Sequence, residues 1–121
     1  MPAHILSIDD ESEIRELLRD VLTASGYRFT GVSTAVEALR VVRADPPALI
    51  ITDLQLEESD GFELIDELKV VAPRIPIILL TGVLFDPEVV NGAVSRKIAA
   101  YVEKTAPLER ILQTVKQHLP A

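Results

Sequence analysis

The sequence predicts an α/β fold: a single doubly wound, five-stranded parallel sheet of (βα)5 type with helices on both faces. Three observations predict it. Five short apolar runs alternate strictly with five segments of helical periodicity, and such alternation implies right-handed crossovers between parallel strands. The central run Ala48–Ile51 is continuously apolar, which is typical of a strand buried on both faces. No linker, repeat or low-complexity segment interrupts residues 1–121, so we expect one domain.

The first half of the chain supplies two strand–helix pairs. We expect strands at 3–8 and 27–32, the second partly polar and therefore suited to a sheet edge. One helix begins near Ser12 and stops at Gly26, and another opens with a capping box at 34–37. The side chains expected to face the core from these two helices are Ile14, Leu17, Leu18, Val21, Leu22, Val36, Leu39 and Val42.

The second half supplies three more pairs. The expected elements are a strand over 48–53, a helix from Gly61 to Pro73, a strand over 75–80, a helix over 87–97, a strand over 98–102 and a helix that begins near Pro107. The helix over 87–97 is weak, because Gly92 in its interior costs about 1 kcal/mol relative to alanine. The more apolar strands belong in the middle of the sheet, which favours the strand order 2-1-3-4-5.

Composition restricts the function. The formal net charge of −7 argues against a direct nucleic-acid surface, which needs a basic patch. The absence of cysteine excludes disulfides and thiolate metal sites. The first apolar run stops at two aspartates, and the longest uncharged run, 75–85, is too short to span a bilayer. We therefore expect a cytoplasmic protein that does not contact a membrane, with the acidic run 57–60 in a solvated loop.

Polar side chains follow four of the predicted strands. Asp9 and Asp10 follow the first strand, Asp53 the third, Thr81 the fourth and Lys104 the fifth. Because the carboxyl ends of parallel strands share one edge of a sheet, we expect these groups to converge. Clustered carboxylates repel one another unless a cation joins them, and oxygen ligands suit Mg²⁺. Asp53, at the centre, could act as a carboxylate nucleophile on phosphorus, with Lys104 and Thr81 stabilising charge on the transferred group.

Each of these residues also has a simpler explanation. Asp9 or Asp10 could begin the first helix, where aspartate is favoured. Thr81 alone could be a strand-end hydroxyl, Lys104 a solvated lysine and Tyr101 a half-buried ring. These explanations do not account for all the polar groups at the ends of the correct strands, so we favour the joint functional interpretation.

Four motifs together carry a resemblance to a known family. They are Ile8-Asp9-Asp10-Glu11, Thr52-Asp53 with Asp60-Gly61, Leu79-Leu80-Thr81-Gly82 and Tyr101-Val102-Glu103-Lys104. With them the chain resembles a response-regulator receiver domain of two-component signalling over its whole length. The resemblance implies that Asp53 accepts a phosphoryl group from a histidine kinase or a histidine phosphotransfer protein. It also implies that Mg²⁺ (or Mn²⁺) is held by Asp10, Asp53 and the backbone carbonyl of Gln55, with Asp9 assisting through water.

The same resemblance implies a switch. Lys104 and Thr81 would contact the phosphoryl oxygens, and Tyr101 would change rotamer together with Thr81. The surface of the fourth helix, fifth strand and fifth helix would then change for a downstream protein or an output domain outside these residues. The domain would catalyse only its own phosphorylation and dephosphorylation, as a monomer or a phosphorylation-dependent homodimer.

The sequence departs from the family pattern in three places. Leu56-Glu57 replaces the usual Met-Pro, which predicts a less rigid and more acidic loop. Thr105 replaces the proline that usually follows the lysine in a cis peptide; a cis bond before threonine costs about 3 kcal/mol, so we expect a trans bond and a differently placed ammonium. Val83 stands where polar residues are common. Together with Gln55 it predicts an altered phosphoryl lifetime, which a Val83→Glu decay measurement tests.

Three alternatives remain open. A phosphatase or phosphotransferase enzyme with an aspartyl intermediate would need a second carboxylate two residues after the nucleophile, where this chain has Gln55. A receiver fold could serve as an interaction module without phosphorylation, and the altered lysine loop keeps that alternative open. A flavodoxin-like cofactor site would want a phosphate-binding loop after the first strand, where Asp9-Asp10-Glu11 would repel a phosphate without a metal.

Overall fold

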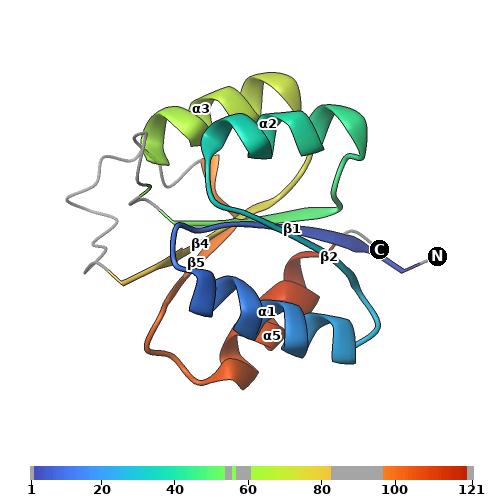
Figure 1. The fold of residues 1–121 in the computed structure, drawn as a ribbon, viewed down its shortest axis with the longest axis vertical. Helices are drawn as coiled ribbons and strands as arrows, with labels where there is room; N and C mark the ends of the chain where they lie inside the picture. The colour runs from blue at the N-terminus through green and yellow to red at the C-terminus, as the bar shows by residue number, and fades with distance from the viewer. Residues whose placement is uncertain (1, 54–55, 57–60, 83–96, 120–121) are drawn as a thin grey trace.

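A parallel sheet of five strands, in the order β2-β1-β3-β4-β5, organises the chain (Figure 1). The computed structural model describes residues 2–53, 56, 61–82 and 97–119. The strands are β1 (His4–Ile8), β2 (Arg28–Val32), β3 (Leu49–Thr52), β4 (Ile77–Thr81) and β5 (Ala100–Glu103). The helices of the described residues are α1 (Ser12–Ala24), α2 (Ala35–Ala44), α3 (Gly61–Val71) and α5 (Leu108–His118). The predicted fold class and strand order are confirmed, whereas the helix expected over 87–97 lies outside the described residues apart from Lys97.

Two helical layers cover the sheet. Helices α2 and α3 lie on one face, and α1 and α5 lie on the other (Figure 1). Alternate residues of each central strand enter opposite cores, so that Leu6 and Ile50 pack on the α2–α3 side while Ile5 and Ile51 pack on the α1–α5 side. This burial on both faces is what the continuous apolar runs predicted.

Two helix faces differ from the prediction. Val36 was expected to face the core, but it is 63% exposed; α2 buries Val42, as predicted, together with Ala38. At about 100° per residue, Val36 lies about 160° from Ala38 around the helix, on the opposite face. Leu17 was also expected inside and is exposed, because Leu18 and Leu22 form the buried stripe of α1.

Local backbone and capping features explain where α1 ends and where α2 begins. Helix α1 ends before Gly26, whose φ of 93° lies in the left-handed region that glycine adopts readily. The predicted cap of α2 is present: the hydroxyl oxygen of Thr34 accepts a hydrogen bond from the Glu37 N–H at 3.2 Å, and the hydroxyl donates to the Glu37 carboxylate at 3.1 Å. In the described part of the chain, every helix is too short or too polar to cross a bilayer.

Candidate functional site at the carboxyl edge of the sheet

Two buried aspartates follow the central strands. Asp9 and Asp53 come directly after β1 and β3, and they are 2% and 3% exposed. Their backbones continue the sheet, since the Asp9 N–H donates to the Val32 carbonyl at 3.0 Å and the Asp53 N–H donates to the Ile8 carbonyl at 3.2 Å. The sheet therefore fixes both carboxylates at one edge, as the polar strand ends predicted.

Lys104 connects the ends of three strands. It follows β5, and its Nζ lies 2.8 Å from Asp53 Oδ2 and 3.0 Å from Asp9 Oδ2. The ammonium also lies 2.5 Å from Oε1 of Glu11, and the lysine side chain is only 10% exposed. The described residues contain no cis peptide bond, so Lys104 precedes Thr105 in the trans form. In this trans loop the ammonium still reaches both buried aspartates.

The cluster has more negative than positive charge. Asp9, Asp10, Glu11 and Asp53 each offer a carboxylate oxygen, and these four atoms lie within 4.8 Å of one another. Burial raises the pKa of Asp9, and the charge of Asp53 raises it further, against the lowering effect of the Glu11 N–H and Lys104. For Lys104, burial lowers the pKa, but its hydrogen bonds to Asp53, Glu11 and Asp9 outweigh burial and raise the pKa overall. The lysine therefore stays charged and neutralises only part of the cluster.

This donor set fits a hard divalent cation. All four groups are carboxylate oxygens, the ligands that Mg²⁺ prefers, and one ammonium leaves an excess of negative charge for an ion to balance. Asp9 and Asp53 are buried, whereas Asp10 and Glu11 are exposed at the entrance, so an ion could enter from solvent and keep some of its water. Gln55, whose carbonyl was the remaining expected ligand, lies outside the described residues.

Glu11 is the site residue to which the sequence analysis assigned no role. Its backbone N–H donates to Asp9 Oδ1 at 2.9 Å, which turns the chain into α1 and brings the Glu11 side chain back to Lys104. The simpler explanation of Asp9 as the start of α1 is not confirmed, because Glu11 is the N-cap of this helix and no side chain caps it. Arg15 also donates to the Asp9 carbonyl at 2.6 Å. The sequence signal for Glu11 was its place in the run of three acids from Asp9.

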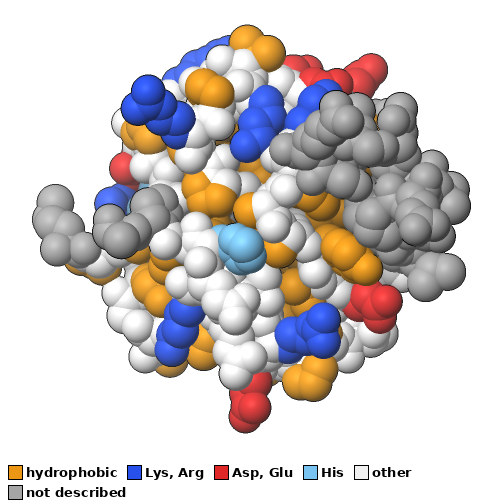
Figure 2. All heavy atoms as spheres, turned by 180° about the vertical axis from the view of Figure 1, so that it is seen from behind, with side chains coloured by type: hydrophobic (Ala, Val, Ile, Leu, Met, Phe, Trp, Pro, Cys, Tyr) orange, Lys and Arg blue, Asp and Glu red, His pale blue; other side chains and the backbone are white. Residues whose placement is uncertain are grey.

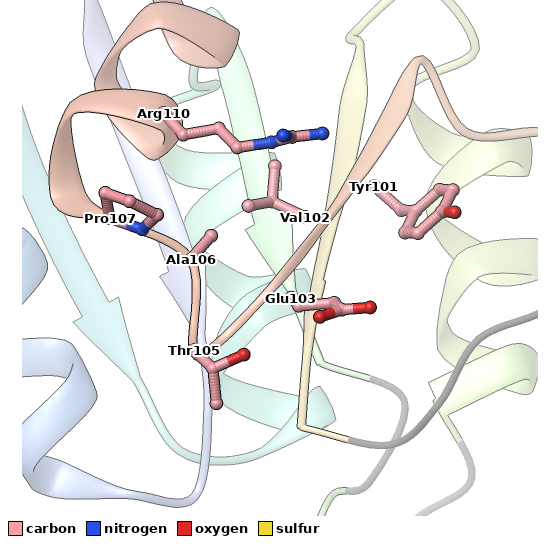
Figure 3. A pocket seen from close by; sticks show the side chains of 7 residues that line it. All are labelled: Tyr101, Val102, Glu103, Thr105, Ala106, Pro107 and Arg110. Carbon is pink, nitrogen blue, oxygen red and sulfur yellow. The ribbon is translucent and has the colours of Figure 1, made fainter.

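The expected switch residues lie on β4 and β5. Thr81 ends β4 and is the register partner of Glu103, but its side chain lies outside the described part of the structure. Tyr101 is paired with Leu79 and is exposed. Figure 3 shows Tyr101 and Val102 pointing to opposite sides of β5, with Arg110 of α5 on the Val102 side. A hollow of about 430 Å³ lies between the end of β5 and the start of α5, next to the strand that carries Lys104.

Comparison with known proteins agrees with this geometry. Residues 5–116 match the family described as the response regulator receiver domain. The chain is 31% identical over 118 residues to the transcriptional regulatory protein GlrR of Escherichia coli (strain K12), an alignment that covers 98% of this chain and 26% of GlrR. It is 31% identical over 127 residues to the polar-differentiation response regulator DivK of Brucella anthropi, covering 98% of each chain.

The fold recurs in a solved structure. The chemotaxis response regulator CheY4 of Vibrio cholerae superposes with a TM-score of 0.89 at 24% identity, over 98% of this chain and 100% of that chain. At this identity the likeness concerns the fold alone. The chain thus spans about a quarter of the length of GlrR and nearly all of DivK.

Proposed function

Because the chain belongs to the response regulator receiver domain family of two-component signalling, we propose that Asp53 accepts a phosphoryl group from a phosphohistidine. The donor would be a histidine kinase or a histidine phosphotransfer protein. The observation that carries this proposal is the position of Lys104, whose ammonium lies 2.8 Å from Asp53 Oδ2 at the carboxyl edge of the sheet. A fixed positive charge at that point stabilises the charge on a phosphoryl group in transfer.

The proposed transfer is a displacement at phosphorus. A carboxylate oxygen of Asp53 forms a bond to phosphorus while the P–N bond of the donor breaks, and the electron pair of that bond stays on the imidazole nitrogen. The product is an acyl phosphate on Asp53. Dephosphorylation would be hydrolysis of this acyl phosphate. The oxygen of a water molecule bonds to phosphorus, and the P–O bond to Asp53 breaks with its electron pair kept by the carboxylate. A proton of the water passes to solvent. These two reactions would be the only chemistry of the domain.

The remaining site residues have supporting roles in this proposal. Asp9, Asp10, Asp53 and the carbonyl of Gln55 would hold Mg²⁺ or Mn²⁺, with Asp9 acting through water. The ion would supply positive charge that offsets the carboxylates and the phosphoryl oxygens. Lys104 would exchange its contact with exposed Glu11 for one with the phosphoryl group, and Thr81 would contact a second phosphoryl oxygen.

Phosphorylation would change the surface around β5. The phosphoryl group of the acyl phosphate carries about −1.5 to −2 of charge in place of the single negative charge of the carboxylate. Thr81 would move toward it, and Tyr101 would fill the space that Thr81 leaves. The surface formed by 87–97, β5 and α5 would then bind a downstream protein or an output domain differently in the two states. We propose a cytoplasmic protein without direct nucleic-acid binding. The phosphorylation-independent alternative is less well supported, because Lys104 reaches Asp53 despite the altered loop.

A phosphorylation assay tests the proposal. Purified chain is incubated with acetyl phosphate and Mg²⁺, and phosphoprotein is measured by intact-mass spectrometry and phosphate-affinity electrophoresis. We expect uptake by the natural chain, none in EDTA, none in Asp53→Asn, and uptake in the matched control Asp20→Asn, an exposed aspartate on α1. Uptake by Asp53→Asn at the natural rate would show that another residue is the acceptor. Candidate phosphorylated kinases then replace acetyl phosphate to identify the donor.

A further inference from the structure

The outer surface of α2 and α3 carries exposed hydrophobic side chains. Among the described residues six large hydrophobic side chains are exposed, and three of them, Val36, Val70 and Val71, lie on these two helices. Val70 is 81% exposed, the largest value of the six. Seen from behind, hydrophobic side chains reach the surface at the top of the molecule, where the α2–α3 layer lies, beside basic and acidic ones (Figure 2).

Two adjoining hollows shape this surface into a groove. One, of about 260 Å³, is lined by Leu39, Arg43, Asp66, Glu67, Val70 and Val71. The other, of about 400 Å³, is lined by Val36, Arg40, Arg43 and Ala44. Arg43 lines both, so the two hollows adjoin at this side chain, and together they are called here the α2–α3 groove. Its apolar floor is flanked by charge on both sides.

The charges of the groove are divided by helix. The α2 side carries Arg40 and Arg43, and the α3 side carries Asp66 and Glu67. Asp66 is paired with Lys97, whereas within the described residues no ion pair is found for Arg40, Arg43 or Glu67. One wall of the groove is therefore basic, and the other offers Glu67 as an unpaired acid.

This division makes the groove complementary to itself. If a second copy is related by a two-fold axis parallel to the groove, α2 of each copy faces α3 of the other, and Arg43 faces Glu67 twice. An axis across the groove would place α2 against α2 and set like charges together. We propose that the α2–α3 groove binds a second copy of this chain in an isologous, two-fold contact, with Leu39, Val70 and Val71 forming the apolar centre.

The contact would leave the phosphorylation site accessible. The groove lies on the outer face of the α2–α3 layer, whereas Asp53 and Lys104 lie at the carboxyl edge of the sheet and Tyr101 lies on β5. Association through the groove therefore needs neither phosphorylation nor the β5–α5 surface, and it is measured on the unphosphorylated chain. A dimer formed through the groove would contain two phosphoryl-acceptor sites.

Variants that exchange the charges of Arg43 and Glu67 test the proposed contact between two copies. The natural chain is studied by sedimentation velocity from about 10 μM to about 1 mM, a range that covers weak to moderate association. We expect a monomer–dimer equilibrium that weakens as salt rises. Arg43→Glu alone and Glu67→Arg alone should each weaken it at least ten-fold (about 1.4 kcal/mol), because both cross-axis pairs become like-charged. The double variant Arg43→Glu/Glu67→Arg should recover association, and an equimolar mixture of the two single variants should form a heterodimer.

The controls distinguish the groove from other surfaces. Arg110→Glu changes the same charge on the β5–α5 side and should leave association unchanged. Circular dichroism of each variant checks folding, and recovery in the double variant excludes a folding defect as the cause. A chain that stays monomeric across the range, or a dimer that Arg110→Glu disrupts and Arg43→Glu does not, would overturn the proposal. Stable binding of a different protein to the groove in place of self-association would equally count against it.

Discussion

Replacing Asp9 by asparagine should stabilise the metal-free protein. Asp9 is buried at 2% exposure within 4.8 Å of three other carboxylate oxygens, with Lys104 Nζ at 3.0 Å as its ionic partner. Asparagine keeps an oxygen that can accept the Glu11 N–H bond, made at 2.9 Å, and removes the charge. The variant therefore removes three repulsions and one attraction at nearly constant shape.

The size of the stabilisation expected for Asp9→Asn follows from the distances between these charges. Because Asp10 and Glu11 are exposed, we use an effective dielectric constant of about 40, between about 20 for pairs near a protein surface and about 80 for water, and unit charges at 4.8 Å then repel by about 1.7 kcal/mol. Three such repulsions come to about 5 kcal/mol, against about 3 kcal/mol of attraction to Lys104 at 3.0 Å. The net gain for Asp9→Asn is about 2 kcal/mol, or about 7 °C in Tm for a domain of this size.

The direction of the stability difference between Asp9→Asn and the natural chain can be tested by changing the pH. Burial raises the pKa of Asp9 in the folded state, so the folded protein binds this proton more tightly than the unfolded chain, and the natural protein loses stability as pH rises through the folded pKa. The advantage of Asp9→Asn should be larger at pH 7 than near the ordinary pKa of 3.8, because the Asp9 carboxylate becomes protonated as pH falls. Mg²⁺ should narrow the difference at pH 7, because ion binding stabilises the natural chain more.

Thermal and urea unfolding in EDTA, at pH 7 and at about pH 4, measure these differences. Asp20→Asn is the matched control, since it makes the same chemical change on the exposed face of α1 and should shift stability by no more than about 0.5 kcal/mol. If Asp9→Asn in EDTA at pH 7 were no more stable than the natural chain, the carboxylates would not be in net repulsion, and the electrostatic argument for a cation site would fail.

Four further outcomes are expected. Lys104→Met should lower the stability of the metal-free protein by about 2 kcal/mol in urea unfolding, because it leaves two buried carboxylates without their cation. The control Lys97→Met removes a surface ion pair and should cost less than about 1 kcal/mol. Equal losses of stability in the two variants would contradict this prediction. Glu11→Gln should raise the rate of phosphorylation by acetyl phosphate up to about five-fold, the equivalent of about 1 kcal/mol, since it releases Lys104 from an exposed partner; a slower rate would show that Glu11 orients the lysine. Thr34→Ala should cost about 1 kcal/mol by loss of the α2 cap, and an unchanged urea midpoint would refute that. Gly26→Ala should also cost about 1 kcal/mol, because φ of 93° is unfavourable for alanine, and an unchanged Tm would argue against it.

The fold could be predicted because its signal is periodic and redundant. Strand β3 is buried on both faces, so its continuous apolar run could hardly belong elsewhere. Helix faces are less certain, since an amphipathic helix buries only a stripe and a neighbouring apolar residue can fall outside it. Val36 was assigned to the core for that reason. Its exposure was knowable only once Ala38 and Val42 fixed the rotation of α2 against the sheet.

The candidate site likewise has a part that the strand pattern predicts and a part that it does not. Topology alone places Asp9, Asp53 and Lys104 at one edge, because parallel strands end together. Glu11 lies beyond the strand, so its position depends on the turn that the Asp9 carboxylate forms with the Glu11 N–H, which no period encodes.

Lys104 shows why the departure at Thr105 could not be evaluated from sequence. The expectation that a trans bond would place the ammonium differently treated the loop as rigid, whereas a lysine has a flexible four-carbon stem. With the trans bond, Lys104 Nζ lies within 3.0 Å of both buried aspartates. The flexible stem can therefore compensate for a change in the loop backbone. The attraction of the carboxylates, rather than the loop conformation, holds the ammonium in place. The charge of the cluster, more than the residue that follows Lys104, then sets the position of the ammonium.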